Sequence, residues 1–338
     1  MFSKVGLRPI YGSAARGTTR RPFLGPHWQV YGQLRRGFFS GKGSWSWQSS
    51  TSSAVPQDGS HQFNYKAAVA FQAKDRDDPF YKALAGKFSA TGEDNYFLKS
   101  INPMNLYAGV ADGVGGWAEH GYDSSAISRE LCNAMSEFAL TLEVPPKKMI
   151  DLGYNKIRKD GTVQVGGTTA IVAHFTPEGE LQVANLGDSW CGVFRNDKLA
   201  FQTKFQTVGF NAPYQLAIIP DQMVREAQRR GSSYIRNQPA DADEYTFQLE
   251  KGDIVLLATD GLTDNVATED MELFLKDNHS LMESNLQKAS QEFVDKTVQL
   301  SKDPGFPSVF SQEVSRLTGQ RYSGGKQDDI TLIVVKVE

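Results

Sequence analysis

Acidic residues at the edges of apolar runs are the part of this sequence best suited to chemistry. Four such groups occur: Glu93-Asp94, Asp112-Gly113, Asp260-Gly261 and Asp328-Asp329. Carboxylate and carbonyl oxygens are the ligands that Mg²⁺ and Mn²⁺ prefer, whereas zinc sites use Cys and His. Because the chain has five His and two Cys, its composition favours an oxygen-ligand metal site over a zinc site.

Two of these groups directly follow an apolar run. Asp112 comes after the run 106–110, and Asp260 comes after the run 254–258. A strand that ends in Asp-Gly can direct the carboxylate away from the sheet, and the glycine lets a cation approach the backbone carbonyl. One Asp-Gly pair alone is more often a hairpin turn. Four acidic groups, each beside an apolar run, favour the metal site.

The elements that position these groups can be read from hydrophobic periodicity. A helix is expected to begin at Asp123 or Ser124, because the following apolar residues repeat at helical spacing: Ile127, Leu131, Met135, Phe138 and Leu142. A second helix is expected after Pro145-Pro146, as far as about Lys159. Further helices are expected at about 268–277 and 284–302.

Apolar and β-branched runs predict the strands, at 165–175, 181–195, 199–204, 244–249, 254–259 and 330–337. Short turn signals between several of them indicate hairpins and mostly antiparallel sheets. The polar segment before 244 is expected to be poor in strands, and a loop is expected before the last strand. Strands alternating with helix pairs predict an α+β fold, an α-β-β-α layered sandwich of two antiparallel sheets flanked by helix pairs, in one domain.

The first 57 residues differ in composition from the rest of the chain. They hold eight of the 36 basic residues and no acidic residue, so 28 basic and 39 acidic residues remain, a net charge of −11. An Arg-rich, acid-free leader is typical of a mitochondrial transit peptide, although a basic tail that binds acidic surfaces stays open. We expect a transit peptide at 1–45, a flexible linker at 46–61 and the folded domain at 62–338.

Composition also excludes several classes of protein. The longest apolar runs are strand-sized, well below the roughly 18 residues of a membrane span, so no transmembrane segment is expected. The acidic body does not favour nucleic-acid binding. The two cysteines, Cys132 and Cys191, have neither the number nor the spacing of a disulfide framework or a zinc site, and we expect buried thiols.

The acidic groups belong to six short motifs in a definite order. These are Glu-Asp at 93–94, Asp-Gly-x-Gly-Gly at 112–116, Gly-Thr-Thr-Ala at 167–170, Asn-Leu-Gly-Asp-Ser at 185–189, Thr-Asp-Gly-Leu-x-Asp at 259–264 and Gln-Asp-Asp-Ile-Thr at 327–331. In this order they resemble the metal-dependent serine/threonine protein phosphatases of type 2C, over nearly all of residues 62–338. The leader and the segment 210–216 resemble the mitochondrial branch of that family. The family fold agrees with the layers expected above.

The resemblance implies roles for the acidic residues. Asp112 would bridge two Mn²⁺ or Mg²⁺ ions, the Gly113 carbonyl would bind one of them, and Asp260 and Asp328 would hold the other. Glu93 would act through water, with Asp94 in support.

Asp188 and Asp264 match positions of a weaker third metal site, and the role of Asp329 is open. A water between the two ions would attack phosphorus, so that Asp112, Asp260 and Asp328 act catalytically through the metals. A side-chain nucleophile is not indicated, because Gly-x-Ser-x-Gly and a P-loop are both missing from the sequence.

Two positions depart from the family pattern. Many members carry His as a proton donor where this chain has Val114, and many carry a phosphate-binding Arg where it has Ser89. Lys87 or Arg129 could take the place of that Arg.

Other polar residues in the motifs and strands have structural explanations. We expect Asn185 and Ser189 to hold a turn, and His174 to be a packed strand residue. His120 is expected at the surface, at the start of a helix, although its place near Asp112 leaves a role in the site open.

The resemblance implies a mitochondrial phosphatase, in the matrix, that acts on phosphoserine and phosphothreonine of phosphorylated mitochondrial proteins. Its substrates would lie in mitochondrial metabolism, with coenzyme Q biosynthesis as one candidate, and we expect a monomer. Val114 and Ser89 motivate a second hypothesis, a pseudophosphatase that acts as a binding or scaffold protein. A small-metabolite phosphatase with the same metals is a third.

Overall fold

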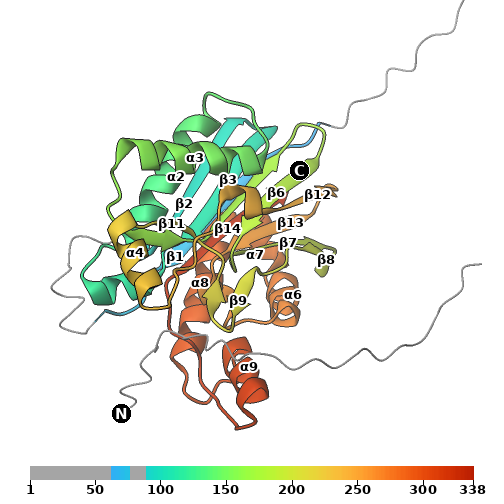
Figure 1. Cartoon of the computed structure of the whole chain (residues 1–338). Coiled ribbons are helices and arrows are strands. Elements are labelled where there is room, and N and C mark those ends of the chain that lie inside the picture. Colours follow the sequence, from blue (N-terminus) through green and yellow to red (C-terminus); the bar gives the residue numbers. More distant parts are fainter. Residues whose placement is uncertain (1–61, 77–88) are drawn as a thin grey trace, which may run out of the picture. The chain divides into compact units, whose positions relative to one another are not determined.

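Two five-stranded sheets form the centre of the fold (Figure 1). The structure is a computed structural model that describes residues 62–76 and 89–338, so the expected transit peptide at 1–45, the linker at 46–61 and Lys87 lie outside the described residues. The first sheet has the order β1 (Tyr65–Gln72), β14 (Ile330–Val337), β13 (Ile254–Ala258), β7 (Trp190–Arg195), β8 (Lys198–Gln202). The second has the order β12 (Asp243–Gln248), β6 (Glu180–Leu186), β5 (Ala170–Phe175), β3 (Asn105–Asp112), β2 (Asp94–Asn102).

Every strand pair in the two sheets is antiparallel. Two short antiparallel pairs lie outside them, formed by β4 (Gly166–Thr168) with β11 (Leu216–Ile218) and by β9 (Thr207–Gly209) with β10 (Ala212–Pro213).

Helices cover the outer face of each sheet. α2 (Ser125–Ala139) and α3 (Pro146–Asp160) share a core with the β3 sheet, and α6 (Thr268–Asp277), α7 (His279–Ser284) and α8 (Leu286–Lys302) share one with the β14 sheet. The remaining short elements are η1 (Gly115–His120), α4 (Asp221–Arg229), η2 (Pro239–Asp241), α5 (Asp260–Thr263) and α9 (Val309–Thr318). The predicted α-β-β-α sandwich is confirmed.

β14 shows why the central strands have few polar residues. Successive side chains of a strand point to opposite faces. Ile333 and Val335 face the core between the two sheets, while Leu332 and Val334 face the core under the helices. Both faces are buried, so the strand is apolar almost throughout.

Helix α2 follows the predicted periodicity only in part. Ile127, Leu131 and Met135 are fully buried in the core with the β3 sheet. The helix ends at Ala139, however, and Leu142 lies beyond it with 40% of its surface exposed. The expectation that Leu142 belongs to the helix was wrong, because the chain turns before it reaches Pro145.

Two helices were not predicted from the sequence. α4 falls in the polar segment, and α9 falls in the expected loop before the last strand. α4 has no buried residue and α9 buries only Ser311, so neither helix contributes large side chains to a hydrophobic core. Local signals for α9 do exist: the Ser308 side chain caps it, and Gly319 ends it at a φ of 71°.

The predicted run 181–195 is broken at Gly187, which has a φ of 112°. The chain passes there from β6 in one sheet to β7 in the other. This crossing carries Asp188, one of the predicted third-site residues. Within residues 62–76 and 89–338, every helix is too short or too polar to cross a membrane.

Candidate active site

The acidic residues lie at strand ends that meet where the two sheets pack. Asp94 begins β2 and is paired directly with Asp112, the last residue of β3. Asp260 follows β13 by one intervening residue, and Asp328 precedes the adjacent strand β14 by one. In an antiparallel pair the beginning of one strand lies beside the end of its neighbour, so the acids of each sheet lie together at one edge.

The two edges face each other, because Thr259 Oγ1, next to Asp260, donates a hydrogen bond to Asp94 at 2.8 Å. Burial and then the neighbouring carboxylates raise the pKa of Asp112 well above its usual value. In decreasing order of effect, those carboxylates are Asp260, Asp94, Asp328 and Asp188. Five of the predicted site residues are therefore brought together in one acidic cluster.

Several oxygens in this cluster are buried without a hydrogen-bond partner among the described residues. They are one carboxylate oxygen each of Asp94, Asp188 and Asp260. A buried, unpaired charged oxygen costs free energy unless a cation meets it. Burial and then Asp260 raise the pKa of Asp188 to about 8, so a bound cation would stabilise its charged form as well. The donor set, made of carboxylates, fits a hard divalent cation.

Two lysines already supply positive charge here. Lys326 Nζ lies 2.6 Å from Asp260, contacts Asp264, and lies 3.4 Å from Asp328. Burial lowers the pKa of Lys326, but these carboxylates more than reverse that effect and hold it well above the usual value. Lys74 Nζ lies 2.7 Å from Glu93 and 2.8 Å from Asp328.

Burial alone would raise the pKa of Asp328, and the two lysines bring it below the usual value instead. Sequence reasoning missed both lysines. The proximity of Lys326 to Asp328 in the sequence was a visible signal, whereas nothing local indicated Lys74.

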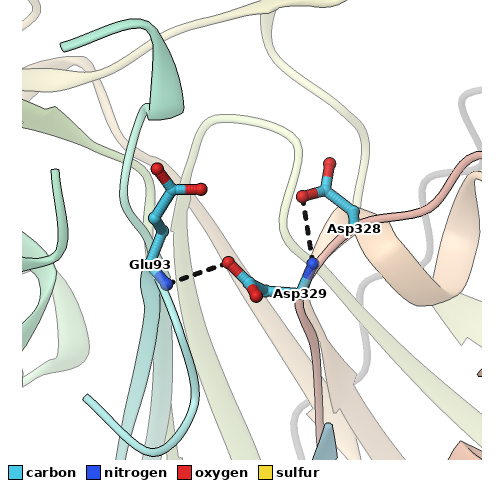
Figure 2. Close-up of side chains that lie close together, drawn as sticks. All are labelled: Glu93, Asp328 and Asp329. Atoms are coloured by element: carbon cyan, nitrogen blue, oxygen red, sulfur yellow. Dashed lines mark hydrogen bonds between the residues drawn. The ribbon is translucent and has the colours of Figure 1, made fainter. Parts of the chain in front are cut away.

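Glu93, Asp328 and Asp329 form a group at the side of the cluster, with carboxylate oxygens within 4.8 Å of one another (Figure 2). Glu93 is almost fully buried; one of its oxygens accepts a hydrogen bond from Ser124 Oγ at 2.5 Å. Its other oxygen faces Lys74 and Arg76.

Asp329 has a different role from its neighbours. Its carboxylate accepts hydrogen bonds from the backbone N–H groups of Lys74 and Glu93, each at 2.9 Å, and from both Nη atoms of Arg76. All of these donors are protein groups that join β1, β2 and the start of β14. The question left open for Asp329 therefore has a structural answer: it is an anchor that holds the cluster's walls together.

The chain approaches itself closely at two glycines beside the acids. A Cβ on Gly113 would lie 2.4 Å from the Ser124 carbonyl oxygen, so any side chain here would force the backbone apart. A Cβ on Gly92, which has a φ of 78°, would lie 2.1 Å from the Asp329 carboxylate.

The positions that depart from the family pattern have local partners. Ser89 Oγ donates to the carbonyl of Gly92 at 2.9 Å, and so holds the turn that leads to Glu93. Val114 lines a cavity on the other side of the loop, with Trp117. Arg129 Nη2 lies 3.3 Å from Asp123 and its Nε 3.2 Å from Glu130. These contacts tie Arg129 to the start of α2, and its role in binding phosphate stays a prediction.

The remaining predicted structural residues are buried as expected. His174 stacks on Tyr107, with ring centres 4.0 Å apart, and its Nε2 bonds Asn105. Asn185 donates to the backbone carbonyls of Gly187 and Lys204 at the corner between the sheets. At the same corner Ser189 Oγ lies 2.8 Å from Thr169 Oγ1.

The cysteines are buried thiols as expected, whereas His120 lies at the surface as expected but at the end of a helix and not at its start. Cys132 and Cys191 are free and buried. His120 is exposed at the end of η1 and lines the same cavity as Val114.

Comparisons with known proteins agree with this fold and site. Residues 102–338 match the family model described as Stage II sporulation protein E (SpoIIE). The chain belongs to the metal-dependent serine/threonine protein phosphatases of type 2C, which confirms the resemblance drawn from its motifs.

Among individual relatives, the chain is 57% identical over 356 residues to Protein phosphatase 2C homolog 7, mitochondrial, of Saccharomyces cerevisiae, and the match covers 100% of both chains. It is 34% identical over 260 residues to Protein phosphatase PTC7 homolog fig of Drosophila grimshawi, covering 75% of this chain and 82% of that one.

Solved structures show the same fold. The photosystem II phosphatase PBCP is 26% identical with a TM-score of 0.66, covering 81% of this chain and 99% of that one. The catalytic domain of the serine/threonine phosphatase PstP, solved in complex with two manganese ions, is 16% identical with a TM-score of 0.50 at the same coverage.

Proposed function

We propose that the chain is a mitochondrial phosphatase that hydrolyses phosphoserine and phosphothreonine in matrix proteins with two Mn²⁺ or Mg²⁺ ions. The observation that carries the proposal is the gathering of Asp94, Asp188, Asp260 and Asp328 around Asp112. The mitochondrial relative from yeast supports the location. A transit peptide at 1–45 and a linker at 46–61 complete the proposal, and the enzyme would act as a monomer.

The residues of the cluster would divide the work as follows. Asp112, the Gly113 carbonyl, Asp260 and Asp328 would hold the two ions, with Glu93 and Asp94 supporting them through water and hydrogen bonds. Asp188 and Asp264 would contribute to a weaker third site. When bound, the cations would activate a water nucleophile and neutralise the phosphoryl oxygens.

Other side chains of the site orient the acids, balance their charge and limit proton transfer. Thr259 Oγ1 donates to Asp94 at 2.8 Å and fixes one of its oxygens, while the other has no hydrogen-bond partner among the described residues. Lys74 and Lys326 balance part of the negative charge and keep the acids close together. Val114 supplies no proton to the leaving group, so either a water takes over that role or turnover is modest.

A phosphothreonine peptide and Mn²⁺ test the proposal directly. The full chain is expected to hydrolyse the peptide in Mn²⁺ and to show no hydrolysis in EDTA. Asp112→Asn should reduce the rate by at least about 10³-fold, since it removes the central ligand of the cluster. Asp151→Asn, a surface change at a residue paired with Lys148, is the matched control and should keep the wild-type rate.

The second candidate function is a pseudophosphatase. It is favoured by the two lysine ammonium groups within the cluster and by Val114. Equal, negligible rates for wild type and Asp112→Asn in Mn²⁺ would favour it and sink the catalytic proposal. Faster hydrolysis of sugar or nucleotide phosphates than of phosphopeptides would point to the metabolite phosphatase instead. Phosphoproteins of coenzyme Q biosynthesis are the natural substrates to try first.

A further inference from the structure

A groove opens beside the acidic cluster, on the side of Asp260. Its volume is about 920 Å³, and the β9–β10 hairpin and α9 contribute to its walls. We name it the aromatic groove, and it is defined by Phe205, Phe210, Phe310 and Leu317 together with Asp260 and Asp264.

The large side chains of this groove are unusually exposed for apolar residues. Phe205 is 52% exposed, Phe210 47% and Leu317 50%. The rings of Phe210 and Phe310 lie 5.1 Å apart and connect the hairpin to the helix. Contiguous exposed apolar side chains in a groove mark a binding surface more often than a solvated one.

The groove is continuous with the acidic cluster. The backbone N–H of Phe310 donates to the carbonyl oxygen of Asp264 at 2.8 Å, which fixes α9 beside the cluster. Lys326 Nζ lies 2.6 Å from an Asp260 oxygen and 5.4 Å from the centre of the Phe310 ring. The ring and the carboxylate are therefore separated by at most the sum of these distances, which two or three residues of extended chain span at about 3.3 Å each.

We propose that the aromatic groove binds a large apolar side chain of the protein substrate, two or three residues from the phosphorylated Ser or Thr. The inference rests on the proposed function, because the phosphoryl group must sit at the acidic cluster for its flanking residues to reach the groove. A peptide fits the space and the apolar walls, and a charged metabolite would leave those walls exposed to water.

Two phosphothreonine peptides test this selectivity in the full chain with Mn²⁺. They are identical except that one carries Leu, and the other Ser, at the second and third positions on both sides of the phosphothreonine. We expect kcat/KM to be about tenfold higher for the Leu peptide, the discrimination that an apolar pocket provides. The difference should lie mainly in KM.

Matched variants locate the effect. Phe210→Ala is expected to reduce the Leu-to-Ser ratio to near one. Val208→Ala is the control, because Val208 lies on the same hairpin and is 59% exposed but does not line the groove; it should keep the wild-type ratio. Leu317→Ala on α9 probes the opposite wall and serves as the second variant if Phe210→Ala fails to fold.

The outcomes separate this proposal from the proposed function. If the chain hydrolyses neither of the two peptides nor p-nitrophenyl phosphate, the proposed function itself is overturned. Equal rates on the two peptides would leave the phosphatase standing and overturn the groove. Equal loss of the ratio in Phe210→Ala and Val208→Ala would also overturn it. A third result would also overturn the groove proposal: the wild type is a dimer, and Phe210→Ala dissociates it without changing the Leu-to-Ser ratio. The groove would then be a contact between two copies of the chain.

Discussion

Asp329→Asn should destabilise the fold strongly, although the neighbouring metal-site change Asp112→Asn should not. The Asp329 side chain is 2% exposed and that of its partner Arg76 12%. Its carboxylate accepts hydrogen bonds from four protein donors, all in the chain between β1 and β2. The substitution removes the charge and turns one acceptor into a donor that faces Arg76 or a backbone N–H.

The size of the effect follows from these contacts. Breaking a buried ion pair by removing one partner costs about 3–5 kcal/mol. Because Asn keeps one acceptor oxygen, we expect the lower end, about 3 kcal/mol. In a domain of this size, about 1 kcal/mol moves the melting temperature by about 2–4 °C, so the variant should melt about 6–12 °C lower.

Asp112→Asn should act in the opposite sense when metals are removed. Burial and four carboxylates raise the pKa of Asp112, so its charge opposes folding until a cation balances it. In EDTA, the free energy of unfolding of this variant is expected to equal or exceed that of the wild type. In Mn²⁺ the order should reverse, because only the wild type gains stability from the bound ions.

Urea unfolding of both variants, followed by circular dichroism in EDTA and in Mn²⁺, measures these differences. If Asp329→Asn loses less than about 1 kcal/mol of unfolding free energy, its contacts stabilise the fold no more than an exposed ion pair does, and the anchor role is refuted. Equal losses for the two variants in EDTA would refute the distinction between anchor and cluster.

Three further predictions concern other parts of the molecule. Gly92→Ala should lose at least about 1 kcal/mol more unfolding free energy than Gly121→Ala, which has a similar φ of 82° but open space at Cβ; equal losses would mean that the clash is relieved. Burial lowers the pKa of His174, so its neutral form is favoured in the fold and the unfolding free energy should fall as the pH drops below about 6.5. His174→Gln should weaken this pH dependence. If urea unfolding between pH 7.5 and 5 depends on pH equally in the variant and the wild type, the prediction is wrong. Burial also raises the pKa of the Cys132 and Cys191 thiols, so neither should react with a thiol reagent until the protein unfolds, and rapid labelling of the native chain would show that one is accessible.

The acids of the site could be predicted because each is tied to a local signal. Asp112 and Asp260 follow apolar runs that are buried on both faces as β3 and β13. Such runs have no polar residue until the strand leaves the core, so the first carboxylate marks the strand's end. That is why a sequence motif could indicate a place in the fold.

Lys74 and Arg76 could not be predicted in the same way. Arg76 and Asp329 are separated by 253 residues and meet because β1 pairs with β14. Pairing of distant strands is set by sheet packing and not by local pattern. The aromatic groove was missed for a related reason, since α9 has almost no buried face from which to infer its position.

The charge balance of the cluster supports our proposal of two divalent ions. Among the described residues, the acidic cluster and the charged side chains beside it hold eight carboxylates and three cations: Glu93, Asp94, Asp112, Asp188, Asp260, Asp264, Asp328 and Asp329, against Lys74, Arg76 and Lys326. At full ionisation this is an excess of five negative charges. One divalent ion leaves three of them unbalanced at a buried site, two leave a single negative charge, and three leave a positive one. By this count a third ion would become favourable when a phosphoryl dianion enters, which is why we propose that the third site at Asp188 and Asp264 is the weaker one.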